Sequence, residues 1–454
     1  MTTVSCASAL LSDGWAQDVV LTIDPDGNIA DIAVNQGSGA SGCALPGIPN
    51  LHSHAHQRAM AGLAEKAGST DDSFWTWRTI MYGFLDAIQP HHLHAIASQL
   101  YVEMLKAGYT HVAEFQYLHH QQDGSHFENI AEMSLQTLLA AQEIGIGITC
   151  LPVHYQFGGF GGQPVADQQR RFANSPDAYL RIVETLAAAT RDDRSSCTGL
   201  TAHSLRAVTR ETFGEILQAT AGNNTQPVHI HIAEQTREVD DCVAWSGLRP
   251  VEYLYENFDV DHRWCLIHAT HMTADETSAV AKSRAVAGLC PTTEANLGDG
   301  FFNATQYLQE GGLFGIGSDS HISISPVEEL RWFEYGQRLM HRSRNQLSGG
   351  HNRSTGRNLF DSILRGGAQA CGTDSGVIEV GKRADFIVLD NKHPLLAERH
   401  GDDLVDSWVF SGNENTVRDV FVGGRQVVTD GHHSAEEAIA QRFRDTIREL
   451  KCTL

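Results

Sequence analysis

The sequence predicts an α/β fold, in which a (β/α)₈ barrel carries a small β-sandwich domain built from both chain ends. First, eight strand-like segments alternate with helical segments through residues 47–372. Second, histidine, aspartate or glutamate follows several of these strands, where barrel enzymes place their active sites. Third, further strand-like segments stand before and after the barrel region.

Residues 1–46 are expected to form the first part of the β domain. The stretch DVVLTIDPDGNIADIAV, residues 18–34, has two apolar runs around DPDGN, which favours a turn between two strands. Residues 373–432 are expected to complete this domain, because strand and turn patterns return at 376–390 and 416–431. Residues 433–454 predict a C-terminal helix.

The barrel region follows a regular order of strands and helices. Helices are predicted at 90–106, where Gly108 is a stop signal, and at 129–145. The strands, some including the loop that follows, are expected within 45–56, 110–117, 146–155, 197–207, 227–235, 263–271, 285–300 and 313–321.

The composition argues against a nucleic-acid-binding, membrane or secreted protein. The formal net charge of -22 argues against binding to nucleic acid or to an anionic membrane surface. No run of about 18 apolar residues is present, and the N-terminus lacks the pattern of a signal peptide. The nine cysteines are scattered, which favours reduced thiols and a cytoplasmic protein.

A group of metal-ligand residues stands at the predicted strand ends. His52 and His54 alternate on one strand, so their side chains share a face. With His231 they offer three imidazoles, and Asp319 adds an oxygen, a set suited to a catalytic zinc or iron ion. Glu234 follows His231 by three residues and can move protons at the same centre. Either motif alone, His-x-His at 52–54 or His-x-x-Glu at 231–234, is more often structural. Their shared position at the ends of predicted strands favours a metal site.

Several strings resemble the amidohydrolase superfamily over essentially the whole chain: PGIPNLHSH, HIHIAE, CLIHATH, GIGSDS and GVIEVGKRADFIVLD. The resemblance implies a metal-dependent barrel. Members with two metal ions commonly carry a carbamylated lysine at the end of strand four. The corresponding segment here, GLTAHSLRA, has no lysine, which favours one metal ion per chain, as in the deaminase branch.

Within that branch the chain is similar to the formimidoylglutamate deiminases, through NLHSHAHQRAMAGLAE, DSFWTWR, AEFQYLHH, HSLRAVT, HIHIAEQTREVDDC, PTTEANLGDG and GSDSHISISPVEELRW. The resemblance implies hydrolytic deimination of N-formimidoyl-L-glutamate to N-formyl-L-glutamate and ammonia, in histidine degradation, by a cytoplasmic homodimer. It implies one Zn²⁺ per chain, with Fe²⁺ as the alternative, bound by His52, His54, His231 and Asp319. It also implies chemical roles for Glu234, His268 and Asp319, and substrate contacts from Gln57, Tyr117, His203, Arg78 and Arg206.

The charge of the chain agrees with a dicarboxylate substrate. A strongly acidic protein needs dedicated cations to hold a dianion, and the planar forks of Arg78 and Arg206 match carboxylates; surface ion pairs are the alternative role for both. Two other functions stay open. One is a related deaminase or hydrolase acting on guanine, cytosine or an s-triazine, which needs fewer cations and more stacking surface. The other is a non-catalytic barrel, which would lack a ligand or an acid–base residue.

Overall fold

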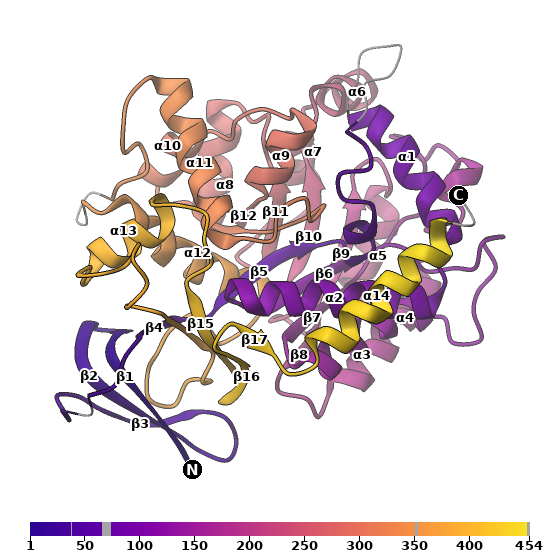
Figure 1. The fold of residues 1–454 in the computed structure, drawn as a ribbon. Helices are drawn as coiled ribbons and strands as arrows, with labels where there is room; N and C mark the ends of the chain where they lie inside the picture. Colours follow the sequence, from indigo (N-terminus) through magenta and orange to yellow (C-terminus); the bar gives the residue numbers. More distant parts are fainter. Residues whose placement is uncertain (38, 66–73, 350–352, 452–454) are drawn as a thin grey trace.

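The computed structural model describes residues 1–37, 39–65, 74–349 and 353–451. The first two residues of the DSFWTWR string and the last three of the chain lie outside the described residues. Strands from both chain ends form one part of the molecule, and alternating strands and helices form the other (Figure 1). The predicted α/β fold is therefore confirmed.

The barrel strands run parallel and follow the chain order. Two sheets, β5–β8 and β9–β13, are joined by single bridges between Ser53 and Asp319 and between His154 and Ala202, so the strands form a closed ring. The strands are β5 (Ile48–Ser53), β6 (Tyr109–Gln116), β7 (Gly147–Pro152), β8 (Ser196–Thr198), β9 (Leu200–Ser204), β10 (Val228–Ile232), β11 (Trp264–His268), β12 (Val286–Leu289) and β13 (Leu313–Ile316).

Two predicted strands are divided in the structure, each at a glycine in close contact with a neighbour. The segment 45–56 breaks at Gly47, where an added Cβ would lie 2.4 Å from the Thr110 hydroxyl. The segment 197–207 breaks at Gly199, where a Cβ would lie 2.5 Å from a Leu151 methyl. Close packing between strands decides both breaks.

Helices surround the strands. The predicted helix at 90–106 is confirmed as α2 (Pro90–Ala107), and Gly108 ends it in the left-handed conformation that glycine adopts readily. The others are α1 (Phe74–Ala87), α3 (Glu132–Ile144), α4 (Pro176–Thr190), α5 (Arg210–Ala219), α6 (Thr236–Ser246), α7 (Pro250–Asn257), α8 (Ala274–Ser283), α9 (Pro291–Leu297), α10 (Ala304–Gln309), α11 (Pro326–His341) and α12 (Thr355–Cys371), with 3₁₀ helices η1 (Ala55–Met60) and η2 (Asp167–Gln169).

The β domain joins the two chain ends in one eight-stranded sheet, with β4 lying between β1 and β14. The predicted hairpin at 18–34 is confirmed as β2–β3, and Asn28 donates its backbone N–H to the Asp24 carboxylate in the turn. The elements are β1 (Thr2–Leu11), β2 (Gly14–Ile23), β3 (Ile29–Ala33), β4 (Cys43–Pro46), β14 (Phe386–Leu389), α13 (Asp402–Phe410), β15 (Val417–Val422), β16 (Arg425–Thr429) and β17 (His432–His433).

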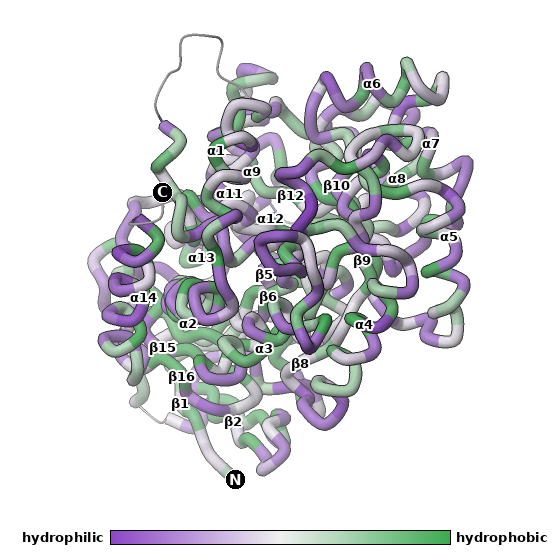
Figure 2. The backbone as a smooth tube through the Cα atoms, turned by 90° about the vertical axis from the view of Figure 1, so that its right-hand side faces the viewer, coloured by the Kyte–Doolittle hydropathy of each residue, from purple (hydrophilic) through white to green (hydrophobic). Residues whose placement is uncertain are grey.

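The chain ends in the helix α14 (Glu436–Lys451), which lies within the predicted helix at 433–454 and packs along α2. Figure 2 shows hydrophilic and hydrophobic residues alternating along it, and Ile439 and Leu450 are buried. Lys106 of α2 and Glu436 form an ion pair at 2.6 Å between the two helices.

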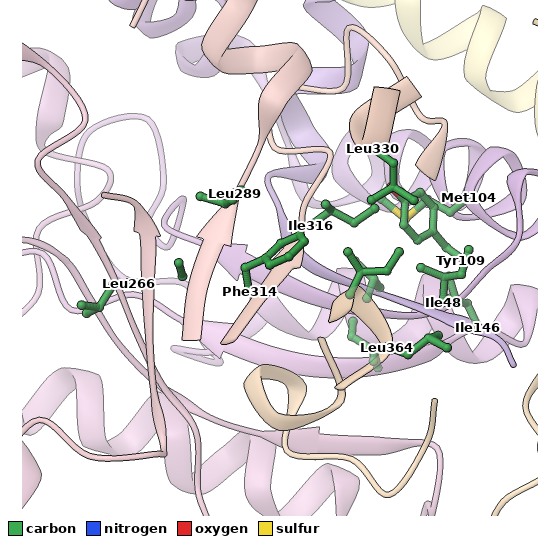
Figure 3. Close-up of a cluster of buried hydrophobic side chains, with 14 of the residues drawn as sticks. Ile48, Met104, Tyr109, Ile146, Leu266, Leu289, Phe314, Ile316, Leu330 and Leu364 are labelled. Atoms are coloured by element: carbon green, nitrogen blue, oxygen red, sulfur yellow. The ribbon is translucent and has the colours of Figure 1, made fainter. Parts of the chain in front are cut away.

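The barrel core is apolar, which fixes the strand ends in place. Figure 3 shows Ile48 of β5 and Phe314 of β13 in one cluster with Leu330 of α11 and Leu364 of α12. Burying such side chains contributes about 1.5–3 kcal/mol each. Among the described residues, every helix is too short or too polar to span a bilayer.

Candidate active site and metal centre

A pocket at the carboxyl ends of the barrel strands brings the predicted site residues together. It is lined by ten of the eleven: His54, Gln57, Arg78, Tyr117, His203, Arg206, His231, Glu234, His268 and Asp319. The eleventh, His52, is fully buried and reaches the pocket through its contacts with His231 and Asp319.

Three imidazoles converge at the floor of this pocket. The Nδ1 atom of His54 lies 2.8 Å from the Phe115 carbonyl, and that of His231 lies 2.9 Å from the His203 carbonyl. Donation from Nδ1 to a carbonyl leaves Nε2 as an electron-pair donor. The Nε2 atoms of His52 and His231 are 3.0 Å apart. Burial lowers the pKa of both rings well below its ordinary value, so two neutral nitrogen atoms meet.

Asp319 completes the cluster. Its Oδ1 lies 3.5 Å from Nε2 of His52 and 3.4 Å from Nε2 of His54. The Asp319 backbone has a φ of 46°, a conformation that non-glycine residues adopt mainly at constrained positions. Its backbone N–H donates to the His52 carbonyl, which ties β13 to β5. Facing nitrogen atoms and a nearby carboxylate form a donor set that fits a zinc or iron ion.

Buried hydrogen bonds fix the backbone that carries His52 and His54. The carboxylate of Glu114 at the end of β6 accepts hydrogen bonds from the Ser53 hydroxyl at 2.6 Å and from the Ala55 backbone N–H at 2.7 Å. The His54 backbone N–H donates to Nε2 of His321 at 3.2 Å. Neither Glu114 nor His321 was among the predicted site residues. Glu114 could have been found, because it stands near the end of a predicted strand, three residues before Tyr117.

His268 lies among three carboxylates on the other side of the pocket. Its Nε2 is 3.7 Å from Glu234 and 3.8 Å from Asp319, and its Nδ1 is 3.2 Å from Glu294. Burial by itself would lower the pKa of His268, but the negative charges of Glu234, Glu294 and Asp319 raise it to about 10. His268 also has a positive φ, 67°. The site therefore places a constrained imidazole among three carboxylates.

Glu234 is 5% exposed and able to exchange a proton near neutral pH. Burial raises its pKa to about 7, against the opposing effects of His268 and Arg206. Acid–base groups work best with a pKa near the working pH. Its backbone N–H donates to the carboxylate of Glu238, in the first turn of α6, at 3.1 Å.

Two arginines enter the same pocket. Burial would lower the pKa of Arg206, but Glu238 and Glu234 raise it, and one terminal nitrogen, Nη1, is buried without a hydrogen-bond partner. The guanidinium of Arg78 lies over the ring of Trp75 at 4.5 Å. Within the described part of the chain, neither arginine has a carboxylate at ion-pair distance. Both cations are placed to receive an anion.

The remaining predicted contacts form the polar and aromatic wall. Gln57 donates to the Tyr117 hydroxyl at 3.1 Å, and the ring of His203 packs edge-on against Tyr155. Tyr155, Phe172 and Trp77, which were not among the predicted site residues, also line the pocket. Tyr155 ends the predicted third strand, so the strand-end rule could have found it. Phe172 and Trp77 lie in segments without such a signal.

Glu294 was missed for a structural reason. The segment 285–300 was expected as a strand with its loop, but the strand ends at Leu289 and the rest forms the helix α9. This helix turns the Glu294 carboxylate toward His268, and the same carboxylate accepts the backbone N–H of Cys290 at 2.9 Å. Glu294 therefore fixes Nδ1 of His268 and leaves Nε2 facing the pocket.

Known proteins are similar to this chain over most of its length. The model of the amidohydrolase family matches residues 43–427. Formimidoylglutamate deiminase of Pseudomonas aeruginosa is 53% identical over 454 residues, which cover 99% of this chain and all of that protein.

Solved structures agree on the fold. The crystal structure of an amidohydrolase from Brucella melitensis matches with a TM-score of 0.94 and 45% identity, covering 99% of this chain and 100% of that one. An adenosine deaminase from Xanthomonas campestris, solved with bound zinc, matches with a TM-score of 0.82 over 98% of both chains. Its 21% identity supports the fold alone. With a family match over most of its length and a relative at 53% identity, the chain belongs to the amidohydrolase family.

Proposed function

We propose that this enzyme hydrolyses N-formimidoyl-L-glutamate to N-formyl-L-glutamate and ammonia, a step of histidine degradation. One observation carries the proposal. Two guanidinium groups without carboxylate partners among the described residues share a pocket with a metal-ligand cluster and the buried carboxyl group of Glu234. A substrate with two carboxylates and a hydrolysable amidine head fits this pocket, because the arginines can bind the carboxylates and the metal-ligand cluster with Glu234 can act on the amidine. The relative at 53% identity is named for this reaction.

The metal is one Zn²⁺ per chain, with Fe²⁺ as the alternative. His52, His54, His231 and Asp319 would hold it, because their donor atoms converge and the imidazoles are neutral. When bound, zinc acts as a Lewis acid that lowers the pKa of a ligated water to about 7. The segment 197–207, which holds His203 at the end of β9 and Arg206 in the loop after it, has no lysine to bridge a second ion.

Asp319, His268 and Glu234 share the proton transfers of the reaction. Asp319, aided by the charge of His268, takes the proton as a water oxygen bonds to the formimidoyl carbon. Glu234 gives its proton to the terminal nitrogen of the resulting tetrahedral carbon. The head enters as the protonated amidine, so its terminal nitrogen leaves as ammonia with the electron pair of the broken carbon–nitrogen bond. The hydroxyl on the carbon gives its remaining proton back to Glu234, which forms the carbonyl of the formyl group, and Asp319 releases the proton that it took to solvent. Glu294 holds His268 in place throughout.

The substrate-binding residues orient the glutamyl portion. Arg78 and Arg206 hold its two carboxylates, and a buried guanidinium nitrogen without a partner, as in Arg206, gains most from such a bond. Gln57, Tyr117 and His203 lie nearer the metal ligands and contact the amidine head.

A related deaminase acting on guanine, cytosine or an s-triazine is the second candidate. The aromatic wall of Tyr82, Tyr155 and Phe172 favours a stacked ring. Two arginines in the same small pocket favour the dicarboxylate, because a neutral ring gives them no partner. A non-catalytic barrel is disfavoured, since all expected ligands and acid–base residues are present.

The deciding experiment is ammonia release from N-formimidoyl-L-glutamate by the zinc-loaded enzyme, beside guanine, cytosine and an s-triazine at equal concentration. Release from the first substrate alone supports the proposal. Turnover of a heterocycle with none of the dicarboxylate would replace it with the second candidate.

We also propose that the enzyme is a cytoplasmic homodimer. A reducing compartment suits the eight described cysteines, all with free thiols. A patch of exposed apolar side chains along α11, formed by Trp332, Tyr335, Leu339 and Met340, offers a surface for a second copy. Sedimentation of the purified chain at several concentrations measures the assembly, and a monomer throughout would reject it.

A further inference from the structure

Arg237 lies just outside the pocket, on the second residue of α6, three residues after Glu234. Its side chain is 64% exposed. Within the described residues, its ion-pair partner is Asp241 at 3.6 Å, one turn along the same helix. Exposed pairs of this kind hold an arginine only weakly. The charge of Arg237 is therefore available to a molecule approaching the site.

Arg237 is connected to the pocket through Trp75. Its guanidinium carbon lies 4.6 Å from the centre of the Trp75 ring. The guanidinium carbons of Arg78 and Arg206, which both line the pocket, lie 4.5 Å and 5.8 Å from the same ring. One indole thus has three arginines around it, two belonging to the pocket and one to the surface.

The two helices that supply this cluster lie together at the same end of the molecule. Figures 1 and 2 both place α1, which carries Trp75 and Arg78, and α6, which carries Arg237, at the end opposite the N-terminal strands. The carboxyl ends of the barrel strands open toward this end, because α6 follows directly on β10. Arg237 and Trp75 therefore form part of the rim of the pocket.

Three like charges around one ring repel each other unless something compensates them. The electron-rich face of the indole attracts each guanidinium, which allows them to gather there. In a chain of net charge -22, a local group of cations also focuses the field that an approaching anion experiences. Arg237, Arg78 and Arg206 therefore form a row of positive charges that leads from the surface into the pocket.

We propose that Arg237 is a further substrate-recognition residue, which captures a carboxylate of the incoming dianion at the rim and passes it to Arg78 and Arg206. This inference rests on the proposed function, because it requires an anionic substrate. Trp75 holds the guanidinium of Arg237 beside the entrance. Arg237 acts on the entry of the substrate and leaves the chemical step to the inner residues.

The test compares Arg237→Gln with Arg181→Gln, which removes the same charge from an exposed position on α4 outside the pocket lining. Steady-state rates with N-formimidoyl-L-glutamate are measured at salt concentrations of about 0.01 M and 1 M, where the screening length falls from about 30 Å to about 3 Å. Arg237→Gln should lower kcat/KM about five- to tenfold at low salt, with kcat unchanged. The difference should fall below about twofold at high salt, while Arg181→Gln stays near the wild-type value.

A second variant and a binding measurement separate this inference from the proposed function. Trp75→Leu should reproduce part of the low-salt loss, because Arg237 loses its support, and should add a loss that persists at high salt, because Arg78 lies against the same ring. Titration with glutarate, a dicarboxylate without a reacting group, should show weaker binding by Arg237→Gln even if the wild-type enzyme fails to turn over formimidoylglutamate. Equal behaviour of Arg237→Gln and Arg181→Gln in both assays, or a loss confined to kcat, would overturn the role of Arg237.

Discussion

Replacing Arg206 with methionine gives the sharpest test of how the substrate is held. Arg206 is contributed by the loop after β9, and its Nη1 atom is buried without a hydrogen-bond partner. Methionine keeps much of the apolar stem of the side chain and removes the charge. Because the lost contacts of Arg206 with protein groups are few, chiefly the Ser204 hydroxyl at 3.3 Å, the fold should survive.

The size of the effect follows from the contact that Arg206 would make. A hydrogen bond to a charged group contributes about 1.5–3 kcal/mol. At 1.4 kcal/mol per decade, this corresponds to roughly a 10- to 150-fold loss in kcat/KM. Arg206→Lys should recover only part of the loss, because a single ammonium cannot replace the planar fork.

The assay uses three substrates that differ in one carboxylate. They are N-formimidoyl-L-glutamate, N-formimidoyl-4-aminobutyrate, which lacks the α-carboxylate, and N-formimidoyl-2-aminobutyrate, which lacks the γ-carboxylate. The matched comparison is Arg78→Met, since Arg78 enters the same pocket from α1. Each arginine should lose its effect on the analogue that lacks its own carboxylate, and the two arginines should differ in which analogue that is.

Equal losses by both variants on all three substrates would refute this assignment. The arginines would then support the pocket structure and would not recognise carboxylates. Thermal midpoints of the variants, measured beside the rates, show whether such a uniform loss follows from a damaged fold.

Four further outcomes are expected. Chelation should abolish activity and one equivalent of zinc should restore it; a requirement for two ions by elemental analysis would contradict the single-metal site. Glu234→Gln should lower kcat by about 10²- to 10⁴-fold with zinc content unchanged, and near-normal kcat would remove Glu234 from the proton transfers. Burial lowers the pKa of His119 to about 3, so the contribution of the neutral ring to folding stability is present above pH 6.5 and lost as the pH falls toward 3. In urea unfolding, His119→Gln should therefore show a weaker decrease of stability with falling pH. An unchanged slope of stability against pH would contradict this expectation. Hydrogen bonds from His432 and Lys106 lower the pKa of Glu436 to about 2, so the contribution of this carboxylate to folding stability is present above pH 4.5 and lost as the pH falls toward 2. Glu436→Gln should lower the free energy of unfolding by about 0.5–1 kcal/mol at pH 7 and leave it unchanged near pH 2. Glu437→Gln, on the same helix, is the control.

The sequence by itself determined the features that depend on a few neighbouring residues. Alternation of residues grouped His52, on β5, with His54, which lies one residue beyond the end of that strand, and turn residues located the β2–β3 hairpin and the end of α2 at Gly108. Each pattern reflects local backbone geometry, which repeats within a few residues. The rule that barrel sites lie at the carboxyl ends of strands then grouped His231, His268 and Asp319 correctly in space.

Only the tertiary structure decided which side chains meet across the barrel. Asp319 lies against His52 because the first and last strands close the ring, and Glu294 reaches His268 because the loop after β12 folds into a helix. Trp75 lies over Arg237 although 162 positions separate them in the numbering. Segments between strands carry no period that fixes their direction, so packing against the closed barrel sets where their side chains lie.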